Sequence, residues 1–183
     1  MKNRFWIAIL IVMTFALGGC ADRMIRDEDD SASKSLVFGY VDMQEAPVSL
    51  DWLTIRQVLP KTDKPYWHAS TDDGMFWNPH IKGGAYQMDA FGGHSGWRNA
   101  NYTFSFPRQY AEGGRFKIQK SGIYFLGSYK YKDVKTGIFE PGKFDFERVD
   151  SPTERELLER LLKFTESNAW KARINQRIAE LSK

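Results

Sequence analysis

The chain has 183 residues, with 26 basic and 23 acidic side chains and a net charge of +3 at pH 7. This length predicts one globular domain. A charge so near zero argues against nucleic-acid binding, which needs a dense basic surface. The balanced charge and the 15% aromatic content also argue against a disordered chain.

The first 20 residues have the layout of a secretory leader. A short positive stretch, Met1 to Arg4, precedes the apolar run FWIAILIVMTFAL and then Gly18, Gly19 and Cys20. Charge, an apolar stretch and small residues before a cleavage point are the three parts of a signal peptide. We therefore expect residues 1–19 to be removed. Because this leader carries Lys2 and Arg4, its removal lowers the net charge from +3 to +1.

The string Leu17-Gly18-Gly19-Cys20 resembles the lipobox, the recognition site of bacterial lipoprotein signal peptidase. In that family leucine stands three residues before an invariant cysteine, with small residues between them, and all four positions match here. The resemblance implies diacylglycerol on the Cys20 sulfur, cleavage after Gly19 and acylation of the new amino group. Its implied partner is the lipid bilayer. Acylation would also mask the single thiol, which has no second cysteine for an internal disulfide.

An uncleaved membrane helix is the alternative interpretation of this segment. Crossing the hydrocarbon core takes about 20 apolar residues. The apolar run is shorter, although the uncharged stretch over 5–21 approaches that length. For sorting, the resemblance favours the inner leaflet of the outer membrane, facing the periplasm. Lipoproteins kept in the inner membrane tend to carry aspartate directly after the cysteine, where this chain has Ala21 and places Asp22 one residue later.

Residues 20–35 are expected to form a lipidated flexible tether, because ADRMIRDEDDSASKS is polar and has no apolar period. Residues 36–150 are expected to form a β-rich domain, since aromatic and β-branched residues alternate with polar ones between glycine and proline turns. This pattern predicts a mainly β (α+β) fold, an antiparallel β-sandwich or barrel-like domain with two C-terminal amphipathic helices. The expected strands cover 36–43, 52–58, 85–91, 101–106, 115–119, 122–132 and 143–147.

Residues 151–183 are expected to form a helical pair that packs on the same domain. Ser151 and Glu154 fit a capping box with Pro152 at the first helical position. Apolar residues then recur at helical spacing. They are Leu157, Leu158, Leu161, Leu162 and Phe164 in the first helix and Trp170, Ile174, Ile178 and Leu181 in the second. The pairs Glu156–Arg160 and Glu159–Lys163 have favourable i,i+4 spacing.

All three histidines fall in the region 60–100, which we interpret as rich in loops. One hypothesis is a metal site formed by His68, His80 and His94 with Asp72, Asp73 or Asp89, because imidazole and carboxylate suit zinc-like ions. Their spacing matches no short metal motif. The alternative is three ordinary histidines beside packed aromatic rings, and no cofactor is expected.

The same region holds Trp67, Trp77 and Trp97, which with Tyr66 and Phe76 suggest a stacking platform for a sugar or peptidoglycan. The alternative is that these rings fill the core. Ser95 does not fit a nucleophile elbow, because the second glycine comes one residue too early. We therefore expect no catalytic residue and a non-enzymatic binding or structural role, with envelope proteins or peptidoglycan as partners. The alternative is a metal- or glycan-binding module or a hydrolase centred on residues 66–97.

Overall fold

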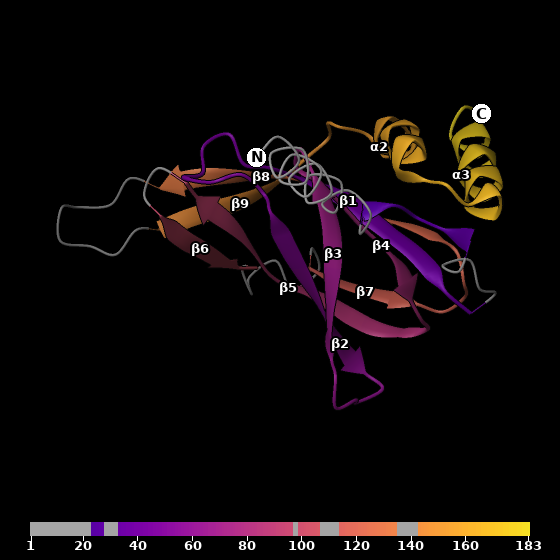
Figure 1. The fold of residues 1–183 in the computed structure, drawn as a ribbon, viewed down its shortest axis with the longest axis horizontal. Coiled ribbons are helices and arrows are strands. Elements are labelled where there is room, and N and C mark those ends of the chain that lie inside the picture. The colour runs from indigo at the N-terminus through magenta and orange to yellow at the C-terminus, as the bar shows by residue number, and fades with distance from the viewer. Residues whose placement is uncertain (1–22, 28–32, 97–98, 107–113, 135–142) are drawn as a thin grey trace, which may run out of the picture.

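The computed structural model describes residues 23–27, 33–96, 99–106, 114–134 and 143–183 (Figure 1). The expected leader, Cys20 and Trp97 therefore lie outside the described residues. Among the helices that are described, none has the length and apolar content needed to span a membrane.

The domain is built on one strongly curled β-sheet. Its strand order is β6-β5-β2-β3-β4-β1-β8-β9, and β7 pairs with β5 off this path. The mainly β prediction is therefore confirmed, with all pairs antiparallel except β1 and β8, which run parallel. The strands are β1 (Ser35–Asp42), β2 (Trp52–Leu59), β3 (Tyr66–Asp72), β4 (Met75–Ile81), β5 (Gly84–Ser95), β6 (Ala100–Ser105), β7 (Arg115–Ile118), β8 (Ile123–Val134) and β9 (Lys143–Val149).

Strand β1 lies in the middle of the sheet and is buried on both faces. Val37 and Val41 belong to the core inside the curl. Leu36 and Phe38 belong to a second core on the outer face. A strand covered on both sides has no solvent face for polar residues, which explains the nearly unbroken apolar run SLVFGYV.

Aromatic side chains hold the two edge strands of the curl together. The ring centroids of Phe106 and Phe146 lie 4.7 Å apart, and those of Phe104 and Phe144 lie 5.3 Å apart. No backbone pairing joins β6 to β9 in the part of the chain that the structure describes. The seam of this half-barrel is therefore packed by side chains in place of a hydrogen-bonded ladder.

The C-terminal residues cover the outer face of the sheet with α2 (Glu154–Leu161), the short 3₁₀ helix η3 (Leu162–Phe164) and α3 (Asn168–Glu180). We call these elements the helix pair, and Figure 1 shows it beside β1 and β4. The expected apolar stripes face the sheet and form the second core, except at Leu181, which is 38% exposed. Its helical members include Leu157, Leu158, Leu161, Trp170 and Ile174, all fully buried.

A capping box does begin the first C-terminal helix, but it starts two residues later than predicted. Thr153 is the N-cap of α2, and Glu156 accepts a hydrogen bond from its backbone N–H at 2.7 Å. The chain at Pro152 is still held to the sheet, because the hydroxyl of Ser128 donates to the Pro152 carbonyl. The helix therefore begins later than Ser151.

The expected ion pairs along the first helix do not form. Glu156 is occupied by the N-cap hydrogen bonds. Arg160 instead reaches the β3–β4 turn, where its guanidinium donates to the carbonyl oxygens of Asp72 and Asp73 at 3.3 Å. Glu159 pairs instead with Arg155 at 2.9 Å. These contacts attach α2 to the end of the β3–β4 hairpin.

The interpretation of the region 60–100 as rich in loops is wrong for its described residues. This region forms β3, β4 and β5, and Asp73 and Gly74 make the two-residue turn between β3 and β4, with φ values of 43° and 77°. A turn with two positive φ angles matches the twist of a hairpin. The aromatic residues here therefore belong to the sheet.

Candidate functional site

The segment just before β1, which we expected to be a free tether, is partly bound to the domain. Ile25 is fully buried in the second core. Its backbone N–H donates to the carbonyl of Phe164 at 2.7 Å, and its carbonyl accepts from the N–H groups of Glu166 and Ser167 at 2.7 and 3.1 Å. The tether expectation is therefore corrected at residues 23–27, which we call the docked segment. Met24 and Ile25 are two adjacent apolar residues in a polar stretch, and they have no periodicity by which to predict this burial.

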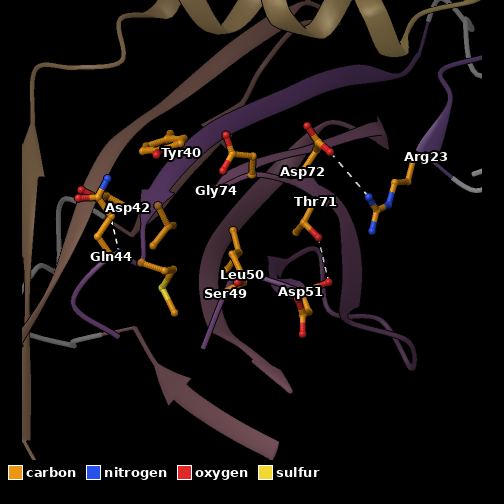
Figure 2. A pocket seen from close by; sticks show the side chains of 13 residues that line it. Arg23, Tyr40, Asp42, Gln44, Ser49, Leu50, Asp51, Thr71, Asp72 and Gly74 are labelled. Carbon is orange, nitrogen blue, oxygen red and sulfur yellow. Dashed lines mark hydrogen bonds and ion pairs between the residues drawn. The ribbon is translucent and has the colours of Figure 1, made fainter. Parts of the chain in front are cut away.

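The docked segment forms one wall of a polar cleft of about 370 Å³ (Figure 2). The other walls come from the end of β1, the β1–β2 connection and the β3–β4 turn. Figure 2 shows Arg23 on the opposite side of this cleft from Tyr40 and Asp42. The polar side chains that line it are Arg23, Tyr40, Asp42, Gln44, Ser49, Asp51, Thr71, Asp72 and Asp73.

Carboxylates dominate the electrostatics of the polar cleft, and several of them have fixed partners. The guanidinium of Arg23 lies 3.8 Å from a carboxylate oxygen of Asp72. Asp51 accepts a hydrogen bond from the backbone N–H of His94 at 2.7 Å, and its carbonyl accepts from the Thr71 hydroxyl at 2.9 Å. Fixed acceptors beside one guanidinium suit the recognition of polar groups.

Tyr40, near the end of β1, lines this cleft and packs against the second core. Burial raises the pKa of its hydroxyl, and the nearby charges of Asp42 and Asp73 raise it further. The β3–β4 turn packs closely on this ring, since a Cβ at Gly74 would stand 2.6 Å from a Tyr40 ring carbon. Tyr40 therefore stays a neutral hydrogen-bonding group at physiological pH.

Arg23 also lines a second cavity of about 300 Å³, which we call the histidine pocket. It lies on the outer face of β3 and β4 and contains His68 and His80. The Lys34 amine lies 3.5 Å from Nδ1 of His80. The structure thus brings together two of the three histidines that the sequence singled out, next to the docked segment.

His94 is placed elsewhere, near the end of β5. Its Nδ1 lies 3.0 Å from the side-chain oxygen of Asn101. The suggested carboxylates also have other partners, because Asp89 pairs with Arg56 at 3.2 Å and Asp72 with Arg23. Within the described ranges, no three His, Cys, Asp or Glu side chains form a group suited to a metal ion. The geometry therefore gives no support to the three-histidine site.

The two described tryptophans of the suggested stacking platform also lie in different parts of the domain. Trp77 is only 1% exposed and packs against the tilted ring of Phe164 in the second core, with ring centroids 4.8 Å apart. Trp67 is half-buried, packs against the core inside the curl and donates to Gln57 at 3.4 Å. Tyr66 is exposed, whereas Phe76 is fully buried on the inner face. Trp77 and Phe76 are core residues, so the proposed stacking platform does not exist as a set.

A more spacious cavity, an aromatic groove of about 690 Å³, lies instead at the barrel seam. Tyr102 and Phe104 of β6, Tyr131 of β8 and Phe144 of β9 line it, together with Pro47. Glu45 at its rim pairs with Lys130 at 2.8 Å, and this contact lowers the pKa of the Glu45 carboxyl. The sequence showed this site only as the alternation of Tyr102, Phe104 and Phe106.

Comparison with protein-family models, with curated proteins and with solved structures finds no match to this chain.

Proposed function

We propose that this chain is a lipid-anchored lipoprotein of the bacterial cell envelope, with a non-enzymatic binding or structural role in the periplasm. The observation that carries the proposal is the succession of a charged start, an apolar run and Leu17-Gly18-Gly19-Cys20.

The mass of the mature protein tests the anchor. Protein extracted from membranes should lack residues 1–19 and carry the mass of a diacylglyceryl group and an amide-linked acyl chain on Cys20. Cys20→Ser removes the acceptor sulfur and should abolish both the lipid and the cleavage. Gly18→Ala keeps a small residue in the recognition site and should be processed normally. An intact leader or an unmodified thiol on the membrane-extracted protein would overturn the proposal.

The side of the envelope has its own test. We place the mature protein in the inner leaflet of the outer membrane, because Ala21 and not aspartate follows Cys20. Ala21→Asp should move the protein to the inner membrane on a density gradient, without loss of the lipid. If the parent protein and Ala21→Asp appear in the same membrane fraction of the gradient, this sorting assignment is refuted.

For the binding role, the polar cleft and the aromatic groove offer concave surfaces of different chemistry. The groove gives the glycan hypothesis a new location, because aromatic faces suit the apolar faces of sugars and Glu45 and Asp133 supply acceptors for hydroxyl groups. Peptidoglycan pull-down with the purified protein should weaken in Tyr102→Ala. Tyr66→Ala, an exposed tyrosine on β3, is the matched control. If neither the parent protein nor the control is retained on peptidoglycan, glycan binding is ruled out.

A further inference from the structure

The docked segment restricts how far the domain can move from its lipid anchor. Ile25 is the fifth residue after Cys20. At roughly 3.4 Å per residue, an extended chain of that length reaches about 17 Å. If the whole stretch to Ser35 were free, the reach would be about 50 Å. Docking therefore removes about two thirds of the available reach.

The contacts of Ile25 make this attachment a specific one. The side chain is fully buried, and its backbone forms a parallel bridge with Thr165. Arg26 adds an ion pair with Glu166 at 3.6 Å, and Arg23 adds the pair with Asp72. These contacts lie on both the helix pair and the β3–β4 hairpin, so they fix the direction in which the chain leaves the domain.

We infer that the face around Arg23, which carries the openings of the polar cleft and the histidine pocket, rests against the phospholipid headgroups. This inference rests on the proposed lipidation of Cys20. Arg23 lines both cavities, and its Cα lies within about 10 Å of the Cα of Cys20, because Arg23 is the third residue after Cys20. The short connection between Cys20 and Arg23 therefore keeps this face close to the bilayer.

The docked segment carries the arginines that can meet lipid phosphates, whereas the charged residues that line the polar cleft beside it are mainly aspartates. The side chains of Arg23 and Arg26 are 50% and 44% exposed. Their ion pairs are 3.8 and 3.6 Å long, and exposed pairs of this kind contribute little stability. Guanidinium groups bind phosphate oxygens through charge-assisted hydrogen bonds. Arg23 is therefore able to exchange its carboxylate partner for a lipid phosphate.

The test measures which end of the domain lies near the membrane. Cys20 is the single cysteine of the chain, so an introduced cysteine is a unique free thiol once Cys20 is acylated. Asn168→Cys places a fluorophore beside Ser167, which contacts Ile25. Thr62→Cys places one in the turn between β2 and β3, which Figure 1 shows on the opposite side of the domain from the helix pair. Both positions are exposed.

The lipidated proteins are placed in vesicles of phosphatidylethanolamine and phosphatidylglycerol that contain a headgroup-attached nitroxide lipid. Quenching should be severalfold stronger at position 168 than at position 62. Inserting about ten Gly and Ser residues between Ala21 and Asp22 leaves the docked segment intact and lengthens the connection. It should reduce the quenching at position 168. Ile25→Ser should do the same by releasing the segment, with circular dichroism confirming that the domain is folded.

Equal quenching at the two positions, or no effect of the insertion, would overturn the inferred orientation. Intact mass on the same samples reports lipidation separately. Lipidated protein with equal quenching contradicts the orientation alone, whereas protein without lipid contradicts the proposed anchor.

Discussion

Ile25 and Thr165 form an isolated parallel β-bridge, which joins the residues just after the proposed lipidation site to the connection between η3 and α3. The bridge places an apolar side chain of a polar segment inside the core under the helix pair. The helix pair therefore has two tasks, because it covers the outer face of the sheet and holds the start of the domain.

We predict that Ile25→Ala destabilises the domain by about 2–5 kcal/mol, the cost of emptying a fully buried isoleucine site. Urea unfolding of a soluble form that begins after Cys20 measures this free energy. The exposed neighbour Arg26 is the control, and Arg26→Ala should change the free energy of unfolding by less than about 0.5 kcal/mol. Equal effects of the two substitutions would show that Ile25 is not packed as described.

The contrast between Ile25 and the strands shows what the sequence can predict. Strands such as β6 and β7 have one face inside the curl. Their apolar and polar residues therefore alternate, and this alternation predicts the strands from the sequence. Phe76 and Trp77 of β4 are adjacent and both buried, one inside the curl and one under the helix pair. A strand covered on both faces loses its alternation, and Pro79 adds a signal typical of loops.

Two local features explain how β4 tolerates these residues. Its register with β1 shifts between Ser35 and Val37, opposite the part of β4 that contains Pro79, and such irregularities accommodate proline. The Asp73-Gly74 pair was the usable sign of a hairpin. The candidate sites were harder to predict. The polar cleft combines residues from four separate parts of the chain, and Arg23 reaches this cleft because the neighbouring Ile25 is buried.

Glycine at position 39 is required by close packing in the centre of the sheet. A Cβ there would stand 2.6 Å from a ring carbon of Phe76 and 2.7 Å from the carbonyl oxygen of Gly127. Gly39→Ala should therefore destabilise the domain by about 1–3 kcal/mol in urea unfolding. Gly96→Ala is the matched control, since a Cβ at Gly96 meets nothing within 4 Å. A stable Gly39→Ala protein would mean that β1 and β8 are farther apart than the structure places them.

The cap of α2 predicts a pH dependence of stability. Hydrogen bonds from the backbone N–H and hydroxyl of Thr153 lower the pKa of Glu156. A carboxylate with a lowered pKa in the folded state stabilises the protein above its unfolded pKa, near 4.3, and this stabilisation is lost as the pH falls through the folded value. Glu156→Gln should therefore lower Tm at neutral pH, and the difference should vanish in acid. Thermal melts of both proteins across this pH range provide the measurement, and a constant difference would contradict the mechanism.

The seam of the half-barrel gives the last prediction. Phe146 of β9 is 1% exposed, and its ring lies 4.7 Å from Phe106, the residue after β6, and 5.1 Å from Tyr129 of β8. Because no backbone ladder joins β6 to β9 among the described residues, removing this ring should open the contact between the edges. Phe146→Ala should cost about 3–5 kcal/mol in urea unfolding. It should also speed amide hydrogen exchange in β6 more than in β2, because β6 has a strand neighbour on one side only. Exchange that rises equally in both strands would mean that the seam is no weaker than the rest of the sheet.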